Sequence, residues 1–132
     1  MLLEVDRHSG VPIYRQLIEQ IRRQIMTGRL RAGDQLESVR ELAGQLKVNP
    51  MTVSKSYSLL EIEGLVERNA GIGVFVAKVK KGQKDKIKAK LLGEIISKAA
   101  FTAIELGLPK DKAIDLFLRQ YLQYDAKRRS LK

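Results

Sequence analysis

The 132-residue sequence predicts a mainly α-helical chain with one small β-hairpin, organised as two regions. Apolar residues recur at helical spacing along most of the chain, and two short apolar runs flank a glycine-bearing turn. A lysine-rich stretch then separates residues 1–77 from residues 78–132. Hydrophobic residues make up 44% of the chain and charged residues 30%, a balance that predicts a globular protein rather than a disordered one.

The first predicted helix covers residues 12–26. Its apolar residues recur every four positions, at Ile13, Leu17, Ile21 and Ile25. Pro12 suits the first turn of a helix, and Gly28 is typical of a residue that follows the last turn. A turn is predicted at residues 31–34.

Residues 38–63 are predicted to form two short helices joined by a tight turn, the dimensions of a helix-turn-helix. Ser38 and Glu41 have the spacing of a capping box at the start of the first helix. Asn49 is predicted to cap the second helix, with Pro50 at its first position.

A β-hairpin is predicted directly after the helix pair. Residues 65–68 and 74–77 are two short apolar runs, and Gly71 and Gly73 lie between them. The two glycines form no dinucleotide-binding fingerprint, because a third glycine and a strand–helix–strand context are missing. Residues 1–77 therefore read as a winged helix-turn-helix domain.

Residues 78–132 are predicted to form a two-helix C-terminal dimerisation region. Residues 78–90 contain seven lysines and one aspartate, and a long helix is predicted from about Lys84 to Leu106, where Gly107 ends it. A last helix follows. Two helices alone cannot bury both faces of the apolar stripe, so we expect a two-fold homodimer. The candidate interface residues are Ile87, Leu91, Leu92, Ile95, Ile96, Ala99, Phe117 and Tyr121.

The net charge of +10 suggests a polyanionic partner. Residues 1–77 carry 10 Lys/Arg against 9 Asp/Glu, whereas residues 78–132 carry 15 against 6. The chain has no Cys and a single His, His8, which argues against a thiolate zinc site, a disulfide scaffold and a cysteine nucleophile. We expect no metal, no cofactor, no membrane segment and a cytoplasmic location.

Double-stranded DNA is the expected partner of the helix pair. In a helix-turn-helix the first helix braces the second, and the N-terminal residues of the second lie near base edges in the major groove. The residues of this end with side chains suited to base or phosphate contact are Asn49, Met51, Thr52, Ser54 and Lys55. Lys78 follows the hairpin directly and is a candidate phosphate contact.

Four segments in order, residues 28–43, 48–57, 60–66 and 71–76, resemble the winged-helix domain of GntR-type bacterial transcription regulators. The remaining residues are similar to the short C-terminal region of the YtrA-like subfamily. The resemblance implies a sequence-specific regulator, most often a repressor, that binds a palindromic operator as a homodimer. It leaves open whether a small-molecule effector exists.

The resemblance also implies roles for particular residues. Arg40 matches a family arginine that contacts DNA, Thr52 matches a threonine of the second helix, and Gly71 lies at the hairpin tip, which the family places at the minor groove. The chain departs from the family pattern where relatives often have arginines, at Pro50 and Ser54. Further departures are Glu37 at a usual proline, Ile72 at an often basic position and Val74 at a usual threonine.

Two other readings remain open. The basic second region could make the chain a nonspecific architectural DNA-binding protein, with weak sequence discrimination. Alternatively, the basic helix could form a membrane-surface or protein-interaction module, in which case Arg40 would be dispensable. An enzyme is disfavoured, because no carboxylate pair, His-centred constellation or phosphate loop is recognisable.

Overall fold

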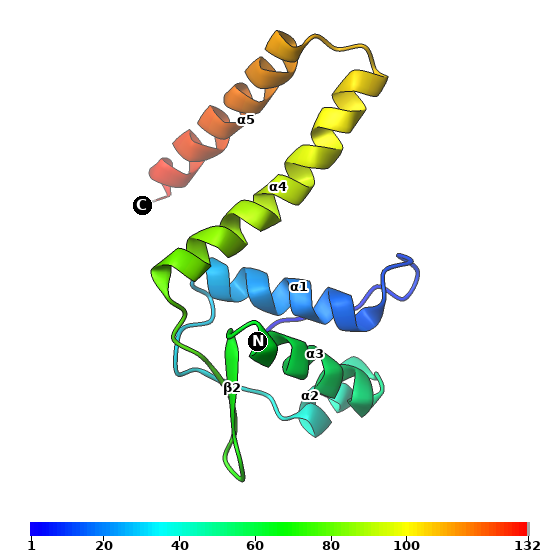
Figure 1. The fold of residues 1–132 in the computed structure, drawn as a ribbon, viewed down its shortest axis with the longest axis vertical. Helices are drawn as coiled ribbons and strands as arrows, with labels where there is room; N and C mark the ends of the chain where they lie inside the picture. Colours follow the sequence, from blue (N-terminus) through cyan, green and yellow to red (C-terminus); the bar gives the residue numbers. More distant parts are fainter. Residues whose placement is uncertain (132) are drawn as a thin grey trace. The chain divides into compact units, whose positions relative to one another are not determined.

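The computed structural model of the protein describes residues 1–131, which form two compact units, residues 1–87 and 88–131. In chain order the elements are helices and short strands (Figure 1): α1 Ile13–Met26, β1 Gln35–Leu36, α2 Val39–Leu46, α3 Pro50–Ile62, β2 Val66–Asn69, β3 Gly73–Val76, α4 Lys81–Glu105 and α5 Lys110–Ser130. The mainly helical fold with a small antiparallel sheet confirms the predicted fold class.

The core of the N-terminal unit lies between α1, α3 and the sheet. The predicted apolar row of α1 is buried except for the half-buried Ile13, and Leu17 and Ile21 are inaccessible to solvent. Val53, Tyr57 and Leu60 of α3 pack against this row and are equally buried. Close packing of this kind holds α3 against α1, while Met51 and Lys55 of α3 stay exposed.

The two short helices begin as their capping residues predict. The Ser38 hydroxyl accepts a hydrogen bond from the Glu41 backbone N–H at 3.0 Å, and the Glu41 carboxylate accepts one from the Ser38 N–H at 3.2 Å. Asn49 caps α3, because its Oδ1 accepts from the Met51 N–H at 2.9 Å. Between the helices Lys47 adopts a left-handed conformation, with φ of 55°. This single residue reverses the chain direction and produces the tight turn of the helix-turn-helix.

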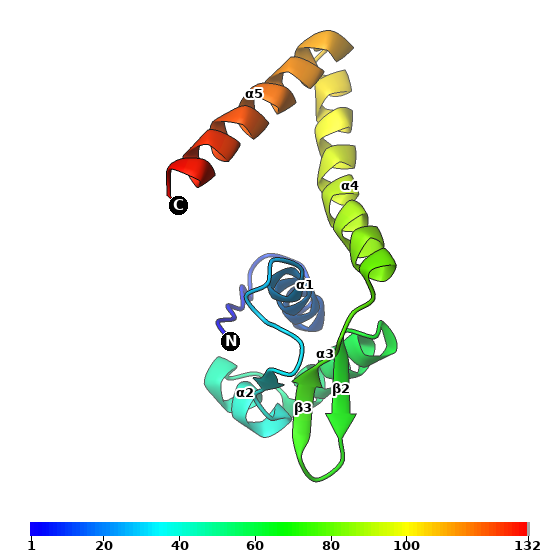
Figure 2. The same ribbon diagram turned by 90° about the vertical axis from the view of Figure 1, so that its left-hand side faces the viewer.

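The sheet has three strands in the order β1-β3-β2, all antiparallel. The predicted hairpin is present, with Val66 opposite Val76 and Asn69 opposite Gly73. The additional strand β1, which pairs Gln35 with Phe75, was not predicted. In Figures 1 and 2, α2 and the tip of the β2–β3 hairpin lie on the side of the unit that faces away from α1.

The C-terminal helices expose most of their apolar residues. α4 starts at Lys81, three residues before the predicted start, and the left-handed Gly107 (φ 67°) ends the segment as predicted. Helix α5 has no buried residue, and α4 and α5 do not pack against each other along their length. No helix within residues 1–131 has the length and apolarity to cross a membrane.

Candidate nucleic-acid interface

The residues predicted to contact DNA lie on α2, on the first turns of α3 and around the hairpin. Arg40 is the second residue of α2 and is exposed to solvent. Met51 is 77% exposed, and Thr52 and Ser54 are partly exposed. The exposed residues also include Asn49, Lys55, Gly71 and Lys78. All of these residues are accessible to a partner, and their roles in binding stay predictions.

Arg40 occupies a position that is electrostatically unfavourable for a cation. The N-terminus of a helix carries a partial positive charge, so a cation in the first turn is repelled by the helix dipole. Its side chain makes no hydrogen bond or ion pair with another described residue. The Arg40 guanidinium is repelled by the dipole of its own helix and has no partner among the described residues. It is therefore available to bind an anion outside the chain.

Asn49 has one side-chain atom engaged and another available. The Oδ1 atom is used in the helix cap, as described above. The amide nitrogen remains exposed and makes no hydrogen bond with another described residue. An asparagine amide can donate to a base edge, so capping and base contact by the same side chain are chemically compatible.

Lys55 contacts an aromatic side chain that was not singled out from the sequence. Its Nζ lies 3.9 Å from the ring centroid of Tyr14, on the first turn of α1. Such a cation–π contact is worth about 0.5–1 kcal/mol at an exposed site. A phosphate or base would have to compete with this ring for the Lys55 ammonium.

Arg68 of β2 is a basic residue that sequence reasoning missed. Its Nη2 donates to the Ser54 carbonyl and to the Ser58 hydroxyl, each at 3.0 Å. The Arg68 backbone N–H donates to the Glu61 carboxylate at 3.2 Å. These contacts place a cation between α3 and the hairpin. The only signal in the sequence was an arginine at the end of a short apolar run.

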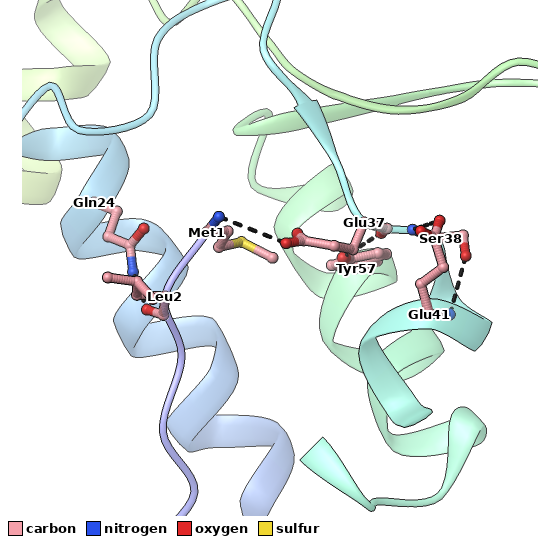
Figure 3. A network of polar contacts seen from close by, with 7 residues as sticks. All are labelled: Met1, Leu2, Gln24, Glu37, Ser38, Glu41 and Tyr57. Carbon is pink, nitrogen blue, oxygen red and sulfur yellow. Dashed lines mark hydrogen bonds and ion pairs between the residues drawn. The ribbon is translucent and has the colours of Figure 1, made fainter. Parts of the chain in front are cut away.

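A buried tyrosine fixes the start of α2 (Figure 3). The Tyr57 hydroxyl donates to the Glu37 carbonyl oxygen at 2.7 Å, one residue before the Ser38 cap. Burial raises the pKa of Tyr57 above its ordinary value of 10.0, and the nearby Glu37 and Glu41 carboxylates raise it further. Tyr57 therefore stays neutral and links the core of α3 to the helix that carries Arg40.

Replacement of Tyr57 by phenylalanine tests this link. The change keeps the ring but leaves the Glu37 carbonyl without its donor, so we expect a loss of about 1 kcal/mol in the free energy of unfolding. Urea denaturation followed by circular dichroism measures the effect. Tyr14→Phe is the matched control and should have a smaller effect, because the Tyr14 hydroxyl makes no hydrogen bond with another described residue. Equal losses in the two variants would contradict the assignment.

The raised pKa of Tyr57 also predicts a loss of stability in alkali. Below pH 10 the phenol is neutral in both the folded and the unfolded state. As the pH rises above 10.0, Tyr57 ionises in the unfolded chain while it remains protonated in the folded chain. The free energy of unfolding should therefore fall more steeply for the wild type than for Tyr57→Phe as the pH rises above about 10. Parallel curves for the two proteins would contradict the prediction.

The candidate dimer residues divide into two groups. Leu92, Ile95 and Ile96 of α4 are exposed by 51%, 54% and 40%. Ala99, Phe117 and Tyr121 are also exposed, and Leu91 is half-buried. Ile87 differs, because it is 8% exposed and belongs to the N-terminal unit. Its apolar surface is already covered within the chain, so it has little left to offer a partner.

Comparison with known proteins agrees with this geometry. Residues 13–76 match the model of the family described as bacterial regulatory proteins, gntR family. The chain is 40% identical over 107 residues to the uncharacterized HTH-type transcriptional regulator YhcF of Bacillus subtilis. The aligned part covers 81% of this chain and 88% of YhcF. It is 37% identical over 110 residues to the HTH-type transcriptional repressor YtrA of the same organism, with 80% and 84% covered.

Solved structures give the same picture. A GntR family transcriptional regulator from Listeria monocytogenes superposes with a TM-score of 0.73 at 31% identity, covering 84% of this chain and 96% of that one. YtrA from Sulfolobus acidocaldarius, a GntR-family transcription factor, has a TM-score of 0.59 at 31% identity and covers 77% and 99%.

The fold and the exposed helix pair define a winged helix-turn-helix protein, a DNA-binding transcriptional regulator and not an enzyme. More particularly, the chain belongs to the GntR family of bacterial regulatory proteins, and it resembles the short members YtrA and YhcF over most of their length.

Proposed function

We propose that the protein is a transcriptional repressor that binds a palindromic operator as a homodimer. The exposed apolar surface of α4 and α5 is the observation that carries the dimer. Fourteen large apolar side chains between Leu92 and Leu131 are each more than a third exposed. Monomeric proteins rarely expose contiguous apolar surface on this scale, and a second copy of the chain would cover it.

The two regions predicted from the sequence have different tasks in this proposal. Residues 1–77 bind DNA, and residues 78–132 form the dimer through Leu91, Leu92, Ile95, Ile96, Ala99, Phe117 and Tyr121. A two-fold axis through the C-terminal unit relates two copies of α3. The two copies would read half-sites about 34 Å apart, or a multiple of this distance, so the operator would be palindromic.

Direct contacts to the operator are assigned to residues of α2, α3 and the hairpin. Arg40, Asn49, Met51, Thr52 and Ser54 are the proposed base or backbone contacts, together with Lys55 when it leaves the Tyr14 ring. Gly71 at the hairpin tip would approach the minor groove. Its φ of 76° lies in the region that favours glycine, and a Cβ there would meet no other atom within 4 Å. Lys78 would contact a phosphate.

The assignment as a repressor is supported by the relatives. The B. subtilis protein YtrA, 37% identical to this chain, is named a transcriptional repressor. A repressor acts when its operator overlaps a promoter, so the position of the site decides the sign of regulation. A DNA partner would place the protein in the cytoplasm. An effector, if there is one, would bind between subunits, since the two-helix unit encloses little volume of its own.

Selection of binding sites tests the proposal. The full-length protein is incubated with a library of randomised duplexes, and bound duplexes are sequenced after several rounds. We expect enrichment of a two-fold symmetric sequence with half-sites about one helical turn, or a multiple of one turn, apart. Enrichment of no sequence would contradict the proposal and favour the architectural alternative, driven by the lysines of residues 78–90.

A further inference from the structure

Residues 1–11, the N-terminal strap, are bound to α1 by three glutamines spaced four residues apart. Gln24 donates to the Leu2 carbonyl at 2.7 Å. Gln20 both donates to the Glu4 carbonyl at 2.6 Å and accepts from the Glu4 N–H at 2.9 Å. Gln16 makes the same pair of hydrogen bonds with the backbone of Asp6, at 2.8 and 2.9 Å. We call Gln16, Gln20 and Gln24 the glutamine ladder.

The spacing of the ladder matches the repeat of an extended chain. Four residues of a helix rise about 6.0 Å, and two residues of an extended strand rise about 6.6 Å. Successive glutamines of the ladder can therefore hydrogen-bond to every second residue of the strap. These hydrogen bonds go to the backbone of the strap, so they fix its path without depending on its side chains.

The strap brings Arg7 to the C-terminal end of α2. The Arg7 Nη2 donates to the Leu46 carbonyl at 3.1 Å and to the Lys47 carbonyl at 2.8 Å. The last carbonyls of a helix lack partners within the helix and carry a partial negative charge. A guanidinium is well suited to this position, because it is always charged and donates several hydrogen bonds.

Arg7 is itself held by the turn that follows it. The Asp6 carboxylate accepts from the His8 N–H at 2.9 Å, and Gln16 donates to the Ser9 hydroxyl at 3.1 Å and to the Val11 carbonyl at 2.8 Å. Gln16 is only 9% exposed, so its contacts with the strap are largely shielded from water. The other end of the strap is also near α2, since the Met1 amino group lies 3.5 Å from the Glu37 carboxylate (Figure 3).

One of the two residues that Arg7 contacts, Lys47, forms the left-handed turn between α2 and α3. Lys47 is the only non-glycine residue of the described chain with positive φ. A side chain in this conformation costs roughly 1 kcal/mol and persists only where neighbouring contacts hold it. The turn then continues through the Val48 N–H, which donates to the Ala43 carbonyl at 3.0 Å.

From these contacts we propose that Arg7, supported by the glutamine ladder, is a positioning residue for DNA binding. It fixes the turn between α2 and α3 and with it the orientation of α3, without contacting DNA itself. This inference rests on the proposed function. It assigns the support of the helix-turn-helix in this chain to a residue outside the motif, because Arg7 lies 40 positions before Lys47 in the sequence.

The salt dependence of binding distinguishes a positioning role of Arg7 from a direct contact with phosphate. Each phosphate contact that is lost reduces the slope of log K against log salt by about 0.9. A positioning residue leaves the number of phosphate contacts unchanged, so its loss lowers affinity without changing the slope. The probe is the duplex that the wild-type chain enriches from the randomised library, measured by fluorescence anisotropy at several salt concentrations.

We expect Arg7→Ala to weaken binding to this duplex about fivefold, with an unchanged salt slope. Amide hydrogen exchange at Val48 should also become faster, because the turn opens more often. Arg29→Ala is the matched control, since Arg29 is exposed and its side chain makes no hydrogen bond with another described residue. It should change neither the affinity nor the exchange at Val48. The double variant Gln20→Ala/Gln24→Ala should behave like Arg7→Ala although it leaves Arg7 in place.

Two results would overturn the inference. A shallower salt slope in Arg7→Ala would mean that Arg7 contacts phosphate, and wild-type affinity would mean that the brace has no part in binding. Wild-type affinity in the glutamine variant would remove Gln20 and Gln24 as supports of Arg7. Failure of the wild-type chain to enrich any duplex would instead contradict the proposed function.

Discussion

Replacing Leu92 and Ile95 together by glutamate is expected to convert the protein to a monomer and to abolish tight operator binding. Both side chains are more than half exposed in the single chain, so the N-terminal core does not need them. In a dimer both positions would be buried. Each introduced glutamate would then either lose its hydration at the interface or force the subunits apart. A monomer has one DNA-binding unit, and it loses the contacts to the second half-site.

The expected size of this effect is large. Burying even one unpaired charge costs several kcal/mol, which is more than a hundredfold in the dimer dissociation constant. Analytical ultracentrifugation at micromolar concentration should give half the wild-type mass. Lys90→Gln/Ser97→Glu is the matched control, because it changes the net charge by the same amount at exposed positions on the other side of α4 and should remain dimeric. A dimer that survives in the first variant would place the interface elsewhere.

Arg40→Ala is expected to weaken operator binding by about 1–3 kcal/mol if Arg40 contacts a base. The same change should leave the thermal stability unchanged or raise it slightly, because it removes a cation from the positive end of the α2 dipole. Loss of binding together with retained stability is the combination that identifies a contact residue. Fluorescence anisotropy and a thermal melt of the same preparation measure the two quantities.

Arg15→Ala provides the control for Arg40. Arg15 is also an exposed arginine in the first turn of a helix, α1, where no acidic residue accompanies it. Its replacement removes the same charge from an equivalent electrostatic position on another helix. We expect little change in operator affinity. Unchanged affinity in Arg40→Ala, or equal losses in the two variants, would contradict a specific role for Arg40.

Local signals in the sequence predicted the helix-turn-helix well. The Ser38–Glu41 spacing predicted a capping box, and the structure contains both of its hydrogen bonds. Asn49 followed by Pro50 predicted the start of α3 in the same way. These features depend on residues at most three positions apart, so the sequence alone was sufficient to find them.

Contacts between distant segments were not predictable by the same means. Strand β1 has only two residues and is defined by the pairing of Gln35 with Phe75. It is too short to show the alternation of apolar and polar residues that predicts a strand. The contact of Lys55 with Tyr14 and those of Arg7 with the end of α2 join residues about 40 positions apart. Their physical basis is the packed arrangement of α1 against α3, which the periodicity of each helix does not specify.

The distribution of charge matters for which residues supply the affinity for DNA, and a specific regulator and an architectural protein differ in this respect. Nine of the ten net positive charges lie in residues 78–132, whereas the helix-turn-helix region is nearly neutral. In a specific regulator the near-neutral face supplies discrimination and the basic residues add attraction that weakens with salt. In an architectural protein the basic residues would supply nearly all of the affinity.

The most direct test compares the wild-type protein on the enriched duplex and on a scrambled duplex of equal composition, by fluorescence anisotropy at two salt concentrations. A specific homodimeric regulator should prefer the enriched duplex by about a thousandfold or more, and its binding to the scrambled duplex should collapse as the salt concentration rises. Equal affinity for the two duplexes, with the same salt dependence, would contradict sequence-specific recognition by the helix-turn-helix.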